Sequence, residues 1–168
     1  MRFLLIAAMA LCAAPLSSMG AHAQDYSFYE SLSVDELIEQ AKKSVGRDGA
    51  VGGAQLVSPA AEVAVEGELS TMPYRCANYT LMRFMSMSGF PTDDLPAINF
   101  CVEMHSKDEV VATFHIPENL ATKLRGDVRV GDVVRLWGRW IYTIEFSKRP
   151  YLLLDDYKLS PDGKASSE

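Results

Sequence analysis

Alternation of apolar and polar side chains over residues 133–146 constrains the fold of this chain more than any other feature. The stretch follows a Gly-Asp turn and reads VVRLWGRWIYTIEF. Successive side chains of a β-strand point to opposite faces, so the pattern predicts a long, half-buried strand. Its predicted inner face holds Val134, Leu136, Gly138, Trp140, Tyr142, Ile144 and Phe146. Its other face brings Arg135, Trp137 and Arg139 together.

Three further segments repeat the two-residue period, residues 151–159 form a last predicted strand, and one short segment between these strands has helical features. A polar turn at 106–109 joins two of the predicted strands, which indicates a hairpin. The predicted helix begins at Pro117 and ends near Gly126, and Leu120 and Leu124 lie four residues apart in it. The four further predicted strands are 62–69, 97–105, 110–117 and 151–159.

The order of strand, long loop, hairpin, short helix and two strands resembles the OB-fold over residues 60–160. This resemblance implies a mainly β, five-stranded Greek-key barrel with a short helix between strands three and four. The Gly-Asp turn, Gly138 inside the fourth strand and the aliphatic-acidic fifth strand are similar to the corresponding parts of many OB-folds. Gly67 looks like the glycine that lets a first barrel strand bend. An SH3-like barrel or a small sandwich also fits the strands, but the helix favours the OB-fold.

An amphipathic helix over residues 34–45 is expected before the barrel. Ser33 and Glu36 form a capping-box pattern at its start, and Gly46 is a natural end. Residues 46–61 are rich in Gly and Ala and indicate a flexible connection. The expected organisation is therefore a helix and linker over 24–59, the barrel over 60–160 and a polar tail over 161–168.

Residues 1–23 have the features of a cleaved secretion signal. Arg2 precedes an apolar run, and Ala21-His22-Ala23 fits the small-x-small rule, so cleavage is expected after Ala23. The apolar run is short for a membrane span, although an uncleaved anchor is the alternative. We therefore expect a periplasmic or secreted protein without an integral membrane span in the mature chain.

Cys76 and Cys101 are the two cysteines that follow this leader. Because exported proteins meet an oxidising compartment, these thiols are expected to form a disulfide. Two cysteines and two scattered histidines do not suggest a zinc site, and the methionines of residues 82–87 show no ligand spacing for copper. The sequence therefore predicts no metal site and no cofactor.

Two surfaces are candidates for binding. Trp137 between two arginines is suited to stack a base, a sugar ring or an aromatic side chain. The alternative is that Trp137 packs under the N-terminal helix while the arginines pair with acidic residues such as Glu66 and Glu68. The long, methionine-rich loop 75–96 is either a partner surface or part of the core with a helical turn at 79–86. The candidate contact residues are Tyr79, Arg83, Phe84, Phe90, Arg135, Trp137 and Arg139.

No sequence motif predicts catalysis. The chain lacks the nucleophile-elbow, zinc-protease and phosphate-loop patterns, and the expected disulfide removes a cysteine nucleophile. Arg2 is the only charged residue of the leader, so the net charge of −6 becomes −7 without it. An acidic chain binds phosphate backbones poorly in general. We therefore expect a non-enzymatic binding or assembly module that contacts another bacterial envelope protein, with binding of single-stranded nucleic acid or oligosaccharide as the alternative.

Overall fold

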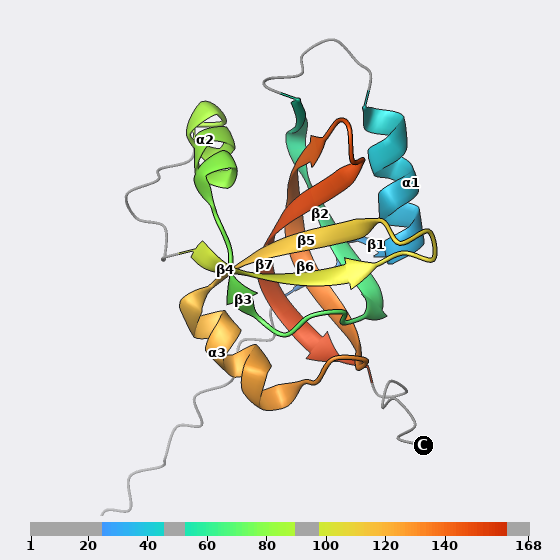
Figure 1. Ribbon diagram of the computed structural model, residues 1–168, viewed down its shortest axis with the longest axis vertical. Coiled ribbons are helices and arrows are strands. Elements are labelled where there is room, and N and C mark those ends of the chain that lie inside the picture. Colours follow the sequence, from blue (N-terminus) through green and yellow to red (C-terminus); the bar gives the residue numbers. More distant parts are fainter. Residues whose placement is uncertain (1–24, 46–52, 90–97, 161–168) are drawn as a thin grey trace, which may run out of the picture.

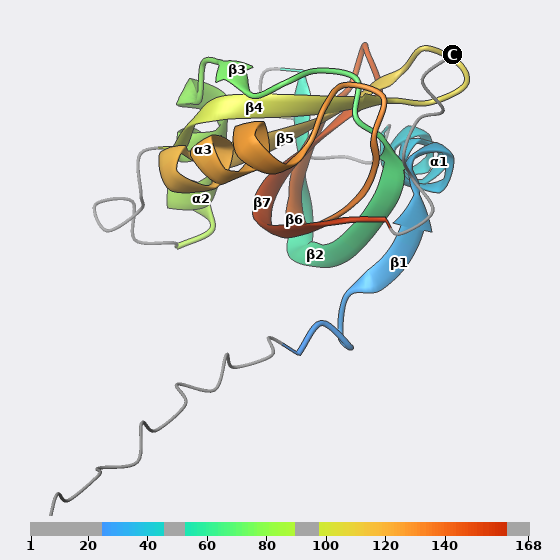
Figure 2. The same cartoon turned by 90° about the horizontal axis from the view of Figure 1, so that it is seen from below.

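The computed structural model describes residues 25–45, 53–89 and 98–160, and it is mainly β (Figures 1 and 2). The leader, the tail, Phe90 and residues 46–52 of the expected linker lie outside the described residues. The elements in chain order are β1 Glu30–Ser33, α1 Val34–Ser44, β2 Ala54–Glu68, β3 Tyr74–Arg75, α2 Tyr79–Met87, β4 Ile98–His105, β5 Val111–Pro117, α3 Glu118–Asp127, β6 Val133–Ile144 and β7 Arg149–Leu159.

These strands form one mixed sheet in the order β1-β2-β6-β7-β5-β4-β3. The predicted hairpin is present as the antiparallel pair β4–β5, and α3 follows β5 as expected. β5 and β7 are parallel, and Leu69, just after β2, forms an isolated bridge to Met104 in β4. The sheet therefore curls, and its two sides meet at that bridge.

The expected strand count of five is wrong, since the described residues form a sheet of seven strands. β1 and β3 extend its two edges, where β1 pairs in parallel with β2 and β3 pairs with β4. Both are too short to show alternation: β1 has four residues and one buried side chain, and β3 has two exposed residues. Hydrogen bonds to a longer neighbour, and not hydrophobic periodicity, create these strands.

The predicted linker also ends too late in the sequence. β2 already begins at Ala54, where it pairs with Ile144 at the far end of β6. The register shifts between Leu56 and Ala61, so this half of the strand joins the sheet through an irregularity. Such a bulge interrupts the two-residue period, which explains why the Gly- and Ala-rich sequence resembled a connection.

The main core lies inside the curled sheet and is shared with two helices. α1 buries Leu37, Ile38 and Ala41 there, and α3 buries Ala121 and Leu124. Figure 1 shows α1 and α3 at different ends of the barrel. Gly67 allows α1 to approach β2, because a Cβ at this position would lie 2.5 Å from Val34 Cγ2.

The predicted capping box is present at the start of α1. The Ser33 backbone N–H donates to the Glu36 carboxylate at 2.7 Å, and the Glu36 backbone N–H donates to Ser33 Oγ at 3.3 Å. Leu32 and Leu37 flank the capping box in the positions of a hydrophobic staple, and both are buried. Local sequence signals therefore define this helix end.

A second, smaller core lies on the opposite face of the sheet, under α2. Leu81, Phe84 and Met85 of α2 pack there, and the side chains that meet them from the sheet and its flanks are Ala54, Ile98, Ile141, Tyr142 and Leu153. The register of β6 shifts between Trp140 and Tyr142, so Trp140 lies in the main core and Tyr142 in the second. Among the described residues, no helix has the length and apolar character needed to cross a membrane.

Candidate functional site

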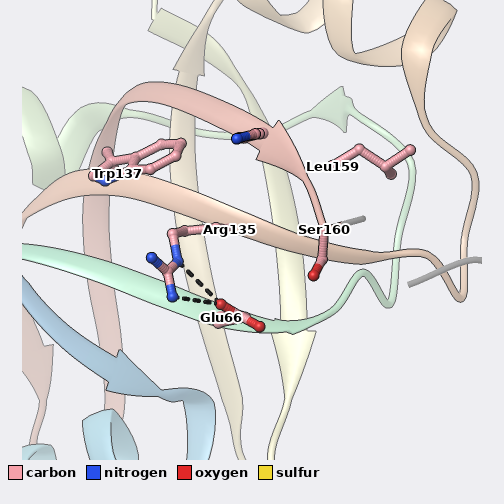
Figure 3. Close-up of a pocket in the computed structure, with 6 residues that line it drawn as sticks. Glu66, Arg135, Trp137, Leu159 and Ser160 are labelled. Atoms are coloured by element: carbon pink, nitrogen blue, oxygen red, sulfur yellow. Dashed lines mark hydrogen bonds and ion pairs between the residues drawn. The ribbon is translucent and has the colours of Figure 1, made fainter. Parts of the chain in front are cut away.

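The two arginines of the Arg135–Trp137–Arg139 face are engaged within the chain. Arg135 donates from Nε and Nη2 to Glu66 Oε2, at 3.0 and 2.7 Å (Figure 3). Arg139 Nη2 donates to Asp155 Oδ1 at 3.0 Å. Glu66 lies on β2 and Asp155 on β7, so the strands on both sides of β6 contribute carboxylates. The positive charge that a phosphate would need is partly neutralised here.

Trp137 itself is covered by the N-terminal segment. Its side chain is only 9% exposed, and the ring of Tyr26 stacks on it with 4.4 Å between centroids. The Tyr26 hydroxyl donates to Asp156, and the Tyr29 hydroxyl donates to Asp155 Oδ2 at 3.0 Å. Burial and these carboxylates raise the pKa of Tyr26 to about 12. Trp137 is therefore part of a packed face, and the residues that cover it precede α1 instead of belonging to it.

A shallow pocket of about 250 Å³ remains beside this packed face (Figure 3). The lining residues are Glu66, Arg135, Trp137, Lys158, Leu159 and Ser160. Glu66 and Arg135 form an ion pair across its wall, and Lys158 adds one further cation. This mixture of charges suits a small polar group better than a continuous polyanion.

The predicted loop at 75–96 contains a helix, α2, with two distinct faces. Tyr79, Arg83 and Met87 recur every four residues and are all exposed, Tyr79 by 77% and Met87 by 54%. Residues four apart lie on one face of a helix, so these three side chains form a continuous stripe, called here the α2 stripe. Phe84, also a candidate contact residue, is instead buried, and its ring stacks on Tyr142 at 4.9 Å.

The predicted Cys76–Cys101 disulfide is present. It lies beside His115, a residue that sequence reasoning did not connect with it. His115 Nδ1 is 3.4 Å from Cys101 Sγ and 3.8 Å from Cys76 Sγ. His115 is 1% exposed, and burial together with the charge of Arg149 lowers its pKa from 6.5 to about 4.

Aromatic and charged side chains continue outward from His115. The rings of Tyr142 and Tyr151 stack at 4.6 Å, and the Tyr142 hydroxyl lies 3.5 Å from His115 Nε2. Arg149 pairs with Glu103 and donates from Nε to the Thr113 hydroxyl at 2.7 Å. The disulfide, His115 and these neighbours share the face of the sheet opposite the main core, and the long-range register of the strands brings them together.

Known proteins resemble this chain only in part of its structure. No protein-family model matches the sequence, and no curated protein matches it. Among solved structures, the chain is similar to a small single-stranded DNA-binding protein from Streptomyces coelicolor. The TM-score is 0.39 at 16% identity, and the match covers 65% of this chain and 100% of that chain. A similarity of this size shows nothing about what this chain binds.

Proposed function

We propose that this chain is an exported, non-enzymatic binding or assembly module that docks another bacterial envelope protein through the α2 stripe. One observation carries the proposal: Tyr79, Arg83 and Met87 form an exposed line along a helix whose opposite face is buried. Tyr and Arg often dominate binding energy at protein interfaces, and Met adapts its shape to a partner. The buried face fixes the helix, so the stripe is presented on a rigid support.

The place of α2 in the chain supports the same proposal. We infer that β2, β4, β5, β6 and β7 form the five strands of an OB-fold, with β1 and β3 as additions. α2 then lies in the connection between the first and second barrel strands, since it falls between β2 and β4. OB-folds use this connection, with the one between strands four and five, to bind ligands.

A protein partner suits these surfaces better than a nucleic acid does. Arg135 and Arg139 pair with carboxylates, and Trp137 is covered by Tyr26. The net charge without the leader is −7, which opposes phosphate binding. The partner surface that complements the α2 stripe has an apolar pocket for Tyr79 and a carboxylate for Arg83.

Export is part of the proposal. The leader pattern of residues 1–23 supports it, and the Cys76–Cys101 disulfide fits an oxidising compartment. Fractionation of the producing bacterium and N-terminal sequencing test this part. A mature chain that begins at Gln24 in the periplasm or medium is the expected result, and a cytoplasmic chain that keeps Met1 contradicts it.

The docking surface is tested with purified protein and a surface-matched control. The test variant combines Tyr79→Ala, Arg83→Glu and Met87→Ala, while the control combines Asn119→Ala and Thr122→Ala on the exposed side of α3. A partner captured by wild type is purified, and its affinity is measured for all three chains. Tyr79 and Arg83 are the two expected anchors, and their loss in the test variant should weaken binding at least about 30-fold.

The control chain should bind as wild type does. Equal affinity of the wild-type and test chains contradicts docking through the α2 stripe. Titration of single-stranded oligonucleotides and oligosaccharides at low and moderate salt addresses the alternative. Binding that is lost in Trp137→Ala would replace the protein-partner proposal with a ligand platform on β6.

A further inference from the structure

Three metal-ligating side chains meet on the outer face of the sheet. Cys76 follows β3, Cys101 lies in β4, and His115 lies directly opposite Cys101 in β5. Their ligand atoms all lie within 4.8 Å of one another. The antiparallel register fixes two of these residues, and the backbone N–H of Cys76 is held by the Asn99 carbonyl at 3.1 Å.

The two nitrogen–sulfur distances of this cluster match those around a coordinated metal. Metal–sulfur bonds of about 2.3 Å and metal–nitrogen bonds of about 2.0 Å place sulfur and nitrogen about 3.5 to 3.8 Å apart. His115 Nδ1 is already 3.4 and 3.8 Å from the two sulfurs. Only the sulfurs have to separate, to about 3.8 to 4.0 Å by the same bond lengths. The Cα atoms of the two cysteines are 5.8 Å apart, which keeps the thiols close after the bond is broken.

His115 is oriented as a ligand. Its side chain is 1% exposed, and its ring lies between the two sulfurs and the Tyr142 hydroxyl. Nε2 lies 3.5 Å from the Tyr142 hydroxyl, on the side of the ring away from the sulfurs. A proton on Nε2 leaves the lone pair of Nδ1 directed at the two cysteines. Metal-bound histidines commonly use their second nitrogen in this way.

We propose that Cys76, Cys101 and His115 bind one monovalent copper ion after the disulfide is reduced. A dithiol supplies two electrons and two protons: its sulfurs form a disulfide, the Cys76–Cys101 bond breaks, and both cysteines become thiols. Copper binding then releases the two thiol protons. Disulfide and metal are therefore mutually exclusive states of one site.

The number of ligands favours monovalent copper over zinc. Thiolates select both ions, but zinc takes a fourth ligand, which is a protein group in structural sites and a water in catalytic ones. No fourth His, Cys, Asp or Glu within the described ranges joins this group. Three ligands are sufficient for monovalent copper.

Cys76 is the half-buried member, whereas Cys101 and His115 are buried, so the reductant reaches the pair from the side of Cys76.

The proposal is tested by metal titration of the purified protein in its oxidised form and after anaerobic reduction by dithiothreitol and desalting. Monovalent copper is titrated against bicinchoninate, and zinc against a chromophoric chelator. The expected result is one copper per reduced chain, bound at least about 1,000-fold more tightly than by the oxidised chain. X-ray absorption should show two sulfur neighbours and one nitrogen neighbour.

Variants separate this site from adventitious thiol binding. His115→Gln keeps both cysteines and should weaken copper binding at least about 100-fold, and Tyr142→Phe should weaken it about tenfold through the second nitrogen. His105→Gln, an exposed histidine on β4, is the matched control and should bind as wild type.

Several results overturn the proposal. These are equal copper affinity in wild type and His115→Gln, no stoichiometric binding by the reduced chain, and preference for zinc over copper. Near-ultraviolet circular dichroism monitors the fold throughout. A reduced chain that loses its native signal and does not regain it with one equivalent of copper also overturns the proposal, because the ligands would then not be held by β4 and β5.

Discussion

The buried, neutral state of His115 predicts how the stability of this protein depends on pH. Its pKa is about 4 in the folded chain and 6.5 when exposed, because burial and Arg149 oppose its protonation. Between these values the unfolded chain binds a proton that the folded chain does not bind. The contribution of neutral His115 to the free energy of unfolding is therefore complete above pH 6.5 and is lost as the pH falls towards 4.

The two pKa values give the size of this effect. Linkage between protonation and folding predicts that acidification from pH 7.5 to 4.5 removes about 2 to 3 kcal/mol from the free energy of unfolding. This is a large share of the stability of a typical domain. His115 is 1% exposed, so solvent screens its charge little.

Urea unfolding at pH 7.5, 6.5, 5.5 and 4.5 measures the effect, with intrinsic fluorescence as the signal. His115→Gln is the reference chain, since glutamine keeps polar atoms at this position and does not titrate. Carboxylates contribute equally to both chains, so the difference between the two pH profiles isolates the histidine. Wild type should lose about 2 to 3 kcal/mol more than the variant over this range. Parallel profiles would refute the reasoning, whatever the absolute stability of the variant.

Three further predictions follow from packing and capping. Tyr26→Ala should uncover Trp137, so its emission should shift to longer wavelength and become quenchable by acrylamide, and an unchanged spectrum would contradict the stack. Gly138→Ala should lower the free energy of unfolding by about 2 to 3 kcal/mol, because the new Cβ would lie 2.6 Å from a backbone carbonyl oxygen of β7. Gly126→Ala, with open space at its Cβ, is the matched control and should not destabilise the protein. Ser33→Ala should destabilise α1 by about 1 kcal/mol through loss of the capping box, seen as faster hydrogen exchange in that helix.

Strong local periodicity accounts for the parts of the fold that the sequence predicts well. The predicted strand 133–146 is observed as Val133–Ile144, and the predicted helix 34–45 as Val34–Ser44. In these segments many side chains repeat one preference, so tertiary contacts reinforce the local pattern. α2 is different, because Asn78 makes no side-chain cap and the only signal is the spacing of Leu81, Phe84 and Met85.

Contacts between distant residues account for what the sequence does not predict. The Tyr26 hydroxyl bonds to Asp156, 130 residues away, and nothing in the local sequence of either segment indicates this contact. The same contact closes the Arg135–Trp137–Arg139 face, which alternation alone leaves equally suited to ligand binding and to packing. Exposure of a strand face depends on what covers it, and here the cover comes from the far end of the described chain.

The pairing of Cys101 with His115 is partly predictable, since the sequence contains most of the information that places these two residues opposite each other. The apolar sets of both hairpin strands have even numbers, and both sets must face the core, so odd residues pair with odd residues across the hairpin. Cys101 then lies opposite Thr113, His115 or Pro117, and a slip of one residue is excluded because it would expose one apolar set. The turn between the two strands decides among these three registers. In it, Glu109 adopts a positive φ of 60°, and the Ser106 backbone N–H donates to the Val110 carbonyl. This turn pairs His105 with Val111 and therefore Cys101 with His115. Hydrophobic alternation thus narrows the partner of Cys101 to three residues, and the conformation of one turn places a neutral imidazole against the disulfide.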